Sequence, residues 1–269
     1  MNKSDCSALY SLKGKVAVVI GGARDLGFDI AEVLAAAGAD TVVTSRRISN
    51  AQATAAKLAD VHKVNTNAYA LEVTDHSDVR SVAIQIAKWR GHIDILFNNA
   101  GGGLGLIPTE FFDRPPQHVE QLIKVNLVGL LYCCQEFARP MVEQRYGKII
   151  NIASMAGLVG RDRRIYSAEG IAEQPVDYAA AKAGVLGATR DLAAVLGSYG
   201  INVNAISPGG FERGQPEEFI NAYTEMTPLC RMGRDGFDLK GAALFLASSA
   251  SDYVSGHNLV VDGGFSVCK

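Results

Sequence analysis

Short apolar runs alternate along the chain with longer segments of helical periodicity. The first run, Lys15–Gly21, is almost wholly apolar and ends in glycine, which is typical of a strand buried on both faces. Asp25–Ala37 then repeats apolar residues at helical spacing, and Gly38 follows as a C-terminal stop. The same reasoning predicts further strands at Asp40–Ser45, Asn67–Val73, Ile93–Asn98, Lys148–Ala153, Gly200–Ile206 and Asn258–Asp262.

Helices are predicted between these strands. Ser77 is the candidate N-cap of a helix over Ser77–Arg90. His118–Arg145 is expected to form one long helix that Pro140 disturbs. Asp235 is expected to cap a helix over Asp235–Ala250. The remaining predicted helices cover Ser49–Val61 and Tyr178–Tyr199, and the pattern assigns no structure to Ser207–Pro228.

This alternation predicts an α/β fold, a doubly wound Rossmann-type parallel sheet of about seven strands with helices on both faces. The 269 residues with 48% hydrophobic content suit one large core, so we expect a single domain over residues 1–269. Residues 1–13 are predicted to form an N-terminal tail. Ligands of such sheets bind at the carboxyl ends of the strands, where the conspicuous glycine and polar residues fall.

Composition argues against several classes of function. The net charge of −2, from 26 basic and 28 acidic residues, gives no basic surface for nucleic acid or an anionic membrane. We find no signal peptide, and no apolar run reaches the roughly 18 residues that span a membrane. Five cysteines without a CxxC and five scattered histidines predict neither a disulfide framework nor a metal site. We therefore expect a reducing, cytoplasmic setting.

Tyr178 and Lys182 are separated by three alanines, so both side chains should lie on one face of a helix. A tyrosine pKa of about 10 must fall by about three units, or roughly 4 kcal/mol, for proton exchange near neutrality. One lysine charge at about 4 Å supplies about that much at an effective dielectric near 20. The spacing is also common on ordinary solvated helices, so it indicates chemistry only in combination with other motifs.

Two stretches at the ends of the first two strands favour a dinucleotide. Gly21 and Gly27 fit a GxxxGxG turn that lets the backbone approach a pyrophosphate, although a purely structural turn is the alternative. Arg46 follows Ser45, which takes the usual place of the acid that binds the ribose hydroxyls of NAD. With Arg24 as a second positive wall, these residues favour NADP(H) over NAD, unless the arginines are only a solvated pair.

Further motifs are Asn98–Gly101, Asn126, Ser154, Pro208-Gly209 and the ending Gly256–Gly264. Together with the glycine turn and Tyr178–Lys182, they make the chain resemble the short-chain dehydrogenases/reductases of the classical type, over roughly Lys13 to Phe265. The resemblance implies hydride transfer between NADP(H) and a secondary alcohol or carbonyl. It also implies a homotetramer.

The resemblance assigns a role to each site residue. Tyr178 would be the general acid/base, Lys182 would lower its pKa and hold the nicotinamide ribose, and Ser154 would bind the substrate oxygen. Asn126 would hold a water in a proton relay. The implied cofactor contacts are Gly21, Arg24, Asp25, Leu26, Gly27, Ser45, Arg46, Glu72, Val73, Asn99, Ala100, Gly101, Tyr178, Lys182, Pro208 and Gly209.

Some residues depart from the family pattern. Asp25 stands where the middle glycine is usual, and would repel a pyrophosphate unless it caps the helix or pairs with Arg24. Glu72 replaces the usual aspartate after the third strand. Tyr166 imitates the tyrosine motif but has Gly170 four residues later in place of lysine, so we prefer Tyr178.

The largest departure is an insertion over residues 161–174, beside the expected active site. One hypothesis is that Arg161, Arg163 or Arg164 meets a substrate carboxylate or phosphate; a solvated loop or a subunit contact is the alternative. Residues 210–230 lie where the family carries its substrate lid. Thr227–Arg234 and the ending Val261–Gly264 most resemble family members that act on sugar acids, polyols or 3-oxoacyl thioesters, and we expect a sugar acid or polyol as substrate. The alternatives are a 3-oxoacyl thioester reductase and a non-catalytic cofactor-sensing protein.

Overall fold

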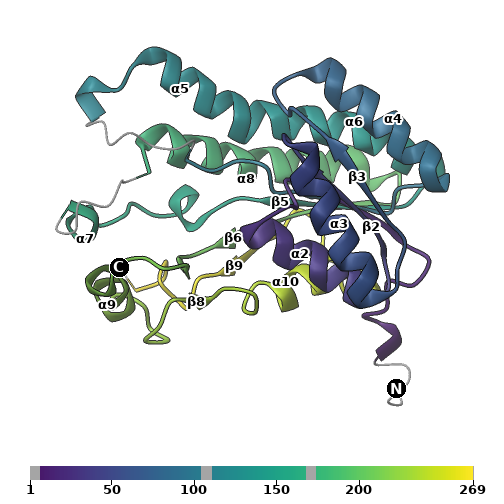
Figure 1. Ribbon diagram of the computed structural model, residues 1–269. Coiled ribbons are helices and arrows are strands. Elements are labelled where there is room, and N and C mark those ends of the chain that lie inside the picture. The colour runs from purple at the N-terminus through teal and green to yellow at the C-terminus, as the bar shows by residue number, and fades with distance from the viewer. Residues whose placement is uncertain (1–6, 104–110, 168–173, 269) are drawn as a thin grey trace.

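The computed structural model describes residues 7–103, 111–167 and 174–268. Its parallel seven-stranded sheet has the order β3-β2-β1-β4-β5-β6-β9, so the chain starts at the centre and winds outward in both directions (Figure 1). This is the predicted doubly wound α/β fold. The strands are β1 Val16–Ile20, β2 Asp40–Ser45, β3 Thr66–Ala70, β4 Ile95–Asn98, β5 Gly147–Ile152, β6 Ile201–Pro208 and β9 Asn258–Val261.

Helices cover both faces of the sheet (Figure 1). One layer contains α2 (Asp25–Ala36), α3 (Ile48–His62) and α10 (Lys240–Ala247); the other contains α4 (His76–Arg90), α6 (Gly129–Gln144) and α8 (Val176–Gly197). Strand β1 is apolar throughout because its alternate side chains enter two cores. Val18 and Ile20 pack beneath the second layer, whereas Ala17 and Val19 pack beneath the first.

The predicted helix over His118–Arg145 is interrupted, but not at Pro140, which lies inside α6. Instead α5 (Pro116–Ile123) passes into a π-helical turn, Lys124–Val128, before α6 begins. Gly129, the first residue of α6, packs so closely that a Cβ there would lie 2.9 Å from the Val73 carbonyl oxygen. Helix α6 therefore continues through Pro140, and the interruption of the predicted helix lies at the π-helical turn. Single π-turns are frequent at functional sites, and this one contains the buried Asn126.

Two predicted caps also differ from the structure. The N-cap of α4 is Asp75, whose carboxylate accepts hydrogen bonds from the backbone of Ser77 at 2.9 Å and of Asp78 at 3.2 Å. Asp235 caps no helix, because α10 begins only at Lys240. The Asp235 carboxylate instead pairs with Arg213 at 2.6 Å. Helix α4 ends at Arg90, as predicted, and is followed by Gly91 as its C-cap with a φ of 80°.

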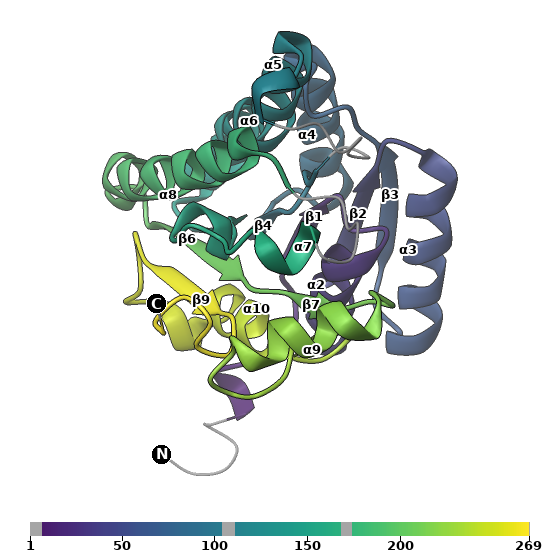
Figure 2. The ribbon, with the colours of Figure 1, turned by 90° about the vertical axis from the view of Figure 1, so that its left-hand side faces the viewer.

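Several short elements lie in front of the carboxyl ends of the strands (Figure 2). These are a 3₁₀ turn at Met155–Gly157, α7 (Arg164–Ser167), α9 (Glu217–Glu225), and the paired strands β7 (Phe211–Glu212) and β8 (Gly233–Arg234). The Tyr166 ring of α7 lies 5.3 Å from that of Phe219 in α9, and Tyr223 stacks on Phe265 at 4.6 Å. The predicted insertion and the predicted lid therefore pack against each other.

Within the described ranges, no helix combines the length and the apolar character that crossing a membrane requires. The same ranges bring together no group of three or more His, Cys, Asp and Glu side chains that could hold a metal ion.

Candidate active site

Ser154, Tyr178 and Lys182 meet at the carboxyl end of β5. Ser154 follows the strand, and the other two lie on α8. The Ser154 side chain lies near enough to Tyr178 to act on the pKa of the tyrosine. The Lys182 ammonium donates to the carbonyl oxygen of Ile152 at 2.7 Å and lies 5.7 Å from the centre of the Tyr178 ring. The predicted i,i+4 pair therefore does share one helix face, and that face points at the end of the sheet.

Small residues allow this approach. A Cβ on Gly157 would lie 2.7 Å from the backbone of Lys182 and Ala183, so only glycine lets the turn after Ser154 pack against α8. Ser154 also begins that turn, since its hydroxyl accepts a hydrogen bond from the Ala156 backbone at 3.1 Å. The Ser154 side chain is thus held by its own turn, in the neighbourhood of Tyr178.

Burial dominates the electrostatics of Tyr178 and Lys182. It raises the pKa of Tyr178 above its ordinary value of 10.0, against the opposing effects of Ser154, Arg161 and Gln174. It lowers the pKa of Lys182 to about 8. Both shifts favour the neutral form, because each group has been taken out of water. From the sequence we expected Lys182 to lower the Tyr178 pKa. In the structure, desolvation is the larger effect, and the Tyr178 pKa is raised.

Asn126 holds the glycine loop that follows β4. Its side-chain oxygen accepts from the Gly102 backbone at 2.8 Å, and its amide donates to the carbonyls of Gly102 at 3.0 Å and Leu122 at 3.1 Å. A Cβ on Gly101 would lie 2.5 Å from the Asn126 oxygen and 3.7 Å from the Lys182 nitrogen. Both amide protons of Asn126 are used inside the protein, so its side chain acts here as a clamp.

The first turn is built around close backbone contacts. Gly21 has a φ of 74°, and a Cβ there would lie 2.9 Å from Ala100. A Cβ on Gly27 would lie 2.1 Å from the Gly21 carbonyl oxygen, which also accepts a hydrogen bond from Asn99 at 2.9 Å. Both glycines are thus required to pack the start of α2, including Leu26, against the ends of β1 and β4. Both glycines of this turn therefore have a structural role.

Asp25 adopts a φ of 52°, in the left-handed region that glycine prefers. Its carboxylate lies 3.5 Å from Arg24, and the two side chains are 50% and 82% exposed. So exposed a pair contributes little to stability. The sequence left two arrangements open for Asp25, capping of the helix or pairing with Arg24. The structure shows pairing with Arg24.

The other predicted cofactor residues lie at the same edge of the sheet. Ser45 ends β2, with Arg46 directly after it. The Glu72 carboxylate accepts from the backbone and the hydroxyl of Thr74, at 3.1 and 2.8 Å, so it is held in place after β3. Pro208 ends β6, and Gly209 bonds to the carbonyl of Val261 at 2.9 Å.

A family model described as enoyl-(acyl carrier protein) reductase matches residues 21–266. The 5-keto-D-gluconate 5-reductase of Escherichia coli (strain K12) is 36% identical over 267 residues, covering 96% of this chain and 98% of that protein. The chain belongs to the classical short-chain dehydrogenases/reductases. As a member of this family it is an oxidoreductase that interconverts alcohol and carbonyl groups with a nicotinamide cofactor.

Two further similarities extend the comparison. The 3-oxoacyl-(acyl-carrier-protein) reductase of Aquifex aeolicus (strain VF5) is 32% identical over 258 residues, which is 94% of this chain and 98% of that protein. The crystal structure of a gluconate 5-dehydrogenase from Burkholderia cenocepacia J2315, in complex with NADP and tartrate, superposes with a TM-score of 0.88 at 32% identity. It covers 98% of this chain and 100% of that one.

The residues of this short-chain dehydrogenase/reductase fit a nicotinamide dinucleotide. An ammonium group has three donors, and Ile152 takes one of those of Lys182, which leaves donors for ribose hydroxyls. Gly101 and Gly102, next to it, have φ values of 152° and 116° and present backbone without side chains. A flat ring can therefore lie against this loop.

Two contacts near Tyr178 were not foreseen from the sequence. Gln174, which ends the insertion, lies near enough to the Tyr178 side chain to act on its pKa. Arg114 forms a buried ion pair with Asp177 at 2.7 Å, which ties the segment before α5 to the start of α8. In the sequence, only the position of Asp177 directly before Tyr178 could have pointed to the ion pair. Gln174 and Arg114 belong to no motif, so their contacts could not be predicted.

Proposed function

We propose that the protein is an NADP(H)-dependent sugar-acid oxidoreductase, which interconverts a secondary hydroxyl and a keto group of a gluconate-like substrate. The observation that carries this proposal is the contact of Tyr178 with Ser154 beside the buried Lys182. The substrate class is supported by the relatives from Escherichia coli and Burkholderia cenocepacia, whose names refer to keto-gluconate and gluconate.

Tyr178 acts in this proposal as the general acid/base. In the reducing direction its raised pKa keeps the hydroxyl protonated, and the proton passes to the substrate oxygen. Ser154 donates a hydrogen bond to the same oxygen and stabilises its developing negative charge. The bound cofactor supplies the hydride to the carbonyl carbon, or accepts it in the oxidising direction.

Lys182 stabilises the tyrosinate that forms when Tyr178 gives up its proton. At neutral pH it is mostly protonated, because its pKa is about 8. As Tyr178 loses its proton, the adjacent tyrosinate and ammonium favour each other's charged forms, so the pair titrates as a coupled unit. Asn126 contributes by clamping the glycine loop beside Lys182. Its place in a proton relay remains part of the proposal.

NADP rather than NAD is proposed from the positive charges around the end of β2. Arg46 and Arg24 offer guanidinium groups to a 2′-phosphate, which arginine binds with paired hydrogen bonds. The Burkholderia neighbour, which is in complex with NADP, supports this choice. We expect Arg46→Ala to raise the KM for NADPH about 10- to 100-fold, the value of one charge-assisted contact, with the KM for NADH unchanged.

The substrate proposal is tested by initial rates of NADPH oxidation with 5-keto-D-gluconate, the neutral ketose sorbose and a 3-oxoacyl thioester. We expect kcat/KM to be largest for the keto acid. A larger value for the thioester would favour the second candidate, a 3-oxoacyl reductase, which the Aquifex relative supports. Cofactor binding without turnover on any of them would favour a cofactor-sensing protein.

We also propose a single-domain, cytoplasmic homotetramer. Its subunit contacts would involve a groove of about 500 Å³ between α6 and α8, lined in part by Ala138, Val142, Leu192 and Leu196. Apolar side chains such as Leu131, Val195 and Val260 are exposed on α6, α8 and β9, which supports burial against other copies. The five cysteines, odd in number, are consistent with a reducing compartment. Sedimentation velocity measures the assembly, and a monomer would contradict it.

A further inference from the structure

Arg161 is a half-buried cation in the insertion. Its guanidinium donates to the Gln174 carbonyl oxygen at 2.6 Å and to the Gln174 side-chain oxygen at 3.3 Å, and it hydrogen-bonds Tyr166. All of these partners are neutral. Among the residues that the structure describes, no carboxylate lies within 4 Å of the Arg161 guanidinium. By contrast, Arg164 is 90% exposed and pairs with Asp162 at 2.5 Å.

The charge of Arg161 lies beside the reacting groups. Gln174, which it holds, lies four residues before Tyr178, and both Gln174 and Ser154 are near enough to act on the pKa of Tyr178. Tyr178 and Arg161 are close enough that the arginine charge acts to lower the tyrosine pKa. The positive charge of Arg161 therefore lies close to the groups that face the substrate oxygen.

An unneutralised cation is costly away from water, and the burial of Arg161 lowers its pKa. A substrate anion that enters the site removes that cost. Guanidinium is well suited to this because its planar donors match the two oxygens of a carboxylate. Arg163 also donates to the Gln174 carbonyl oxygen, at 3.0 Å.

We propose that Arg161 binds the carboxylate of the substrate, so that the insertion recognises the acid group while Ser154 and Tyr178 hold the reacting oxygen. The inference rests on the proposed function and adds the residue that selects an acid over a neutral polyol. Tyr166 positions the guanidinium, because its ring is packed against Phe219 of α9. Arg161 is thus a specificity determinant contributed by the segment that departs most from the family pattern.

The test uses two substrates that differ only in charge, D-gluconate and its neutral amide, D-gluconamide, with NADP. In Arg161→Ala we expect the KM for gluconate to rise about 10- to 100-fold, the value of a charge-assisted hydrogen bond. The KM for gluconamide should change less than about threefold, since an amide makes no ion pair. Arg161→Lys should restore part of the gluconate affinity, because lysine keeps the charge but loses the paired geometry.

Arg164→Ala is the matched control, since this arginine lies in the same insertion but is exposed and already paired with Asp162. Its KM values should equal those of the wild type. NADPH affinity, followed by cofactor fluorescence, should be the same in all three variants. This readout shows that the site is still folded when Arg161 is removed.

The outcomes separate the two proposals. Suppose that the wild type uses gluconate, and that Arg161→Ala raises the KM for gluconate and gluconamide equally or changes neither KM. The role of Arg161 is then refuted, while the sugar-acid activity stands. If wild type turns over no sugar acid but reduces a 3-oxoacyl thioester, the proposed function is refuted, and the assignment of Arg161 to a substrate carboxylate falls with it.

Discussion

Strand β5 has a buried lysine at each of its ends. Lys148 lies at the amino end, and its ammonium pairs with Asp252 at 2.7 Å and Ser251 at 3.3 Å. Lys182 reaches the carboxyl end from α8 and bonds the Ile152 carbonyl at 2.7 Å. Burial lowers the pKa of both, but the Asp252 carboxylate opposes the shift of Lys148, whereas burial alone acts on Lys182.

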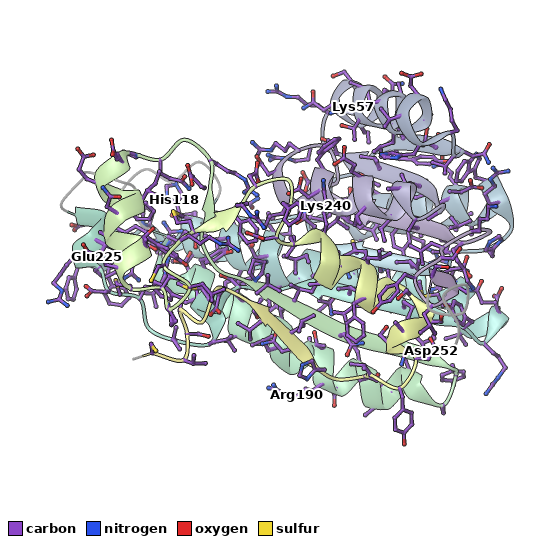
Figure 3. The ribbon with its side chains drawn as sticks, turned by 90° about the horizontal axis from the view of Figure 1, so that it is seen from below. Lys57, His118, Arg190, Glu225, Lys240 and Asp252 are labelled. Atoms are coloured by element: carbon purple, nitrogen blue, oxygen red, sulfur yellow. The ribbon has the colours of Figure 1, made fainter. Side chains whose placement is uncertain are left out.

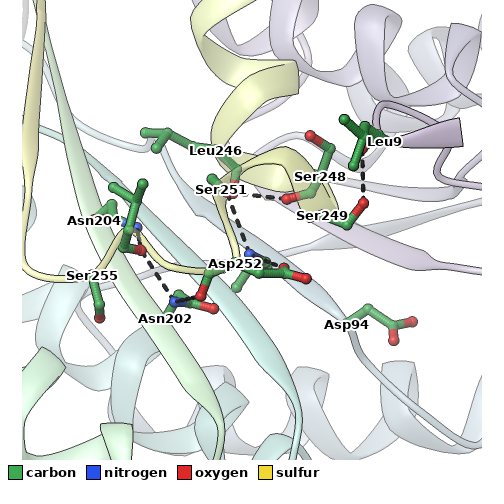
Figure 4. Close-up of polar contacts among 12 residues, drawn as sticks. Leu9, Asp94, Asn202, Asn204, Leu246, Ser248, Ser249, Ser251, Asp252 and Ser255 are labelled. Carbon is green, nitrogen blue, oxygen red and sulfur yellow. Dashed lines mark hydrogen bonds and ion pairs between the residues drawn. The ribbon is translucent and has the colours of Figure 1, made fainter. Parts of the chain in front are cut away.

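The surroundings of the two lysines explain the difference. At the amino edge polar groups bond one another: Ser251 donates to the Leu246 carbonyl at 3.0 Å, and Asn202 donates to that of Asp252 at 3.1 Å (Figure 4). At the carboxyl edge Lys182 and Arg161 have only neutral partners among the described residues. Figure 3 shows Asp252 far from Glu225 of α9, which lies toward the carboxyl edge. The charge of Lys148 is thus paired within the protein, whereas Lys182 and Arg161 have no anionic partner among the described residues.

The largest expected effect separates the two lysines by activity. Lys182→Met should reduce kcat at least about 10³-fold, because proton transfer by Tyr178 loses the charge that stabilises it. Lys148→Met should keep kcat within about threefold, since it touches no part of the site. Steady-state rates with saturating NADPH measure both. Comparable losses in the two variants would contradict the assignment of function to one edge only.

The pH dependence of stability gives the next effect. The Lys182 pKa is about 8 in the folded protein, against an ordinary value of 10.5, so below pH 8 the folded protein bears the full cost of a buried charge. Between these values the unfolded chain binds more protons, and stability gains from this group as the pH rises. The total is roughly 3 kcal/mol, at 1.36 kcal/mol for each pKa unit.

Because other groups also titrate in this range, the measurement is a difference. Lys182→Met should be more stable than wild type in denaturant at pH 7, and its advantage should shrink between pH 8 and 10.5. An advantage that is constant over this range would mean that Lys182 is not desolvated. Lys148→Met serves as the comparison, since the Asp252 carboxylate offsets part of the effect of burial on the Lys148 pKa.

A smaller effect tests the amino edge. Lys148→Met should lower the free energy of unfolding by about 1–2 kcal/mol, because Ser251 and Asp252 lose a charged partner. The loss stays small because the Asp252 side chain is 62% exposed and can return to water. Urea unfolding at pH 7 measures it, with cofactor affinity as control. A weakened NADPH affinity would show that the two edges are coupled.

Much of this fold was predictable because parallel strands are buried on both faces. Strands such as Val16–Ile20 are therefore apolar without interruption, and the glycine and polar residues after them mark one edge. Tyr178, Lys182 and Ser154 were found from spacing and resemblance. The π-turn at Lys124–Val128 was missed because it accompanies the close packing of Gly129 against Val73, a tertiary contact that no local pattern records.

The electrostatics of the site were the least predictable part. The helical spacing suggested that the charge of Lys182 lowers the Tyr178 pKa. In the structure, burial instead raises the Tyr178 pKa and lowers that of Lys182. Burial depends on how α8, the π-turn and the insertion pack together. For the same reason Arg161 could be named as a hypothesis, whereas its link to Tyr178 through Gln174 required the fold.

The smallest expected effect concerns strain, which the carboxyl edge carries in the glycine turn. Asp25 has a φ of 52°, in the left-handed region. In the turn before β6, a φ of 75° is adopted by Gly200, which has no side chain. Asp25→Gly should relieve a backbone cost of about 1 kcal/mol and remove a negative charge from the expected pyrophosphate site. We expect the Kd for NADPH to fall a few-fold, measured by cofactor fluorescence at two salt concentrations.

Salt distinguishes the two contributions of Asp25, because screening weakens the charge effect and leaves the backbone effect unchanged. Asp25→Asn is the matched variant, since it removes the charge but keeps a side chain that tolerates the left-handed region. If Asp25→Asn binds NADPH as tightly as Asp25→Gly at low salt, repulsion is the main cost. If neither variant binds more tightly than wild type, the carboxylate points away from the cofactor, and its pairing with Arg24 is sufficient.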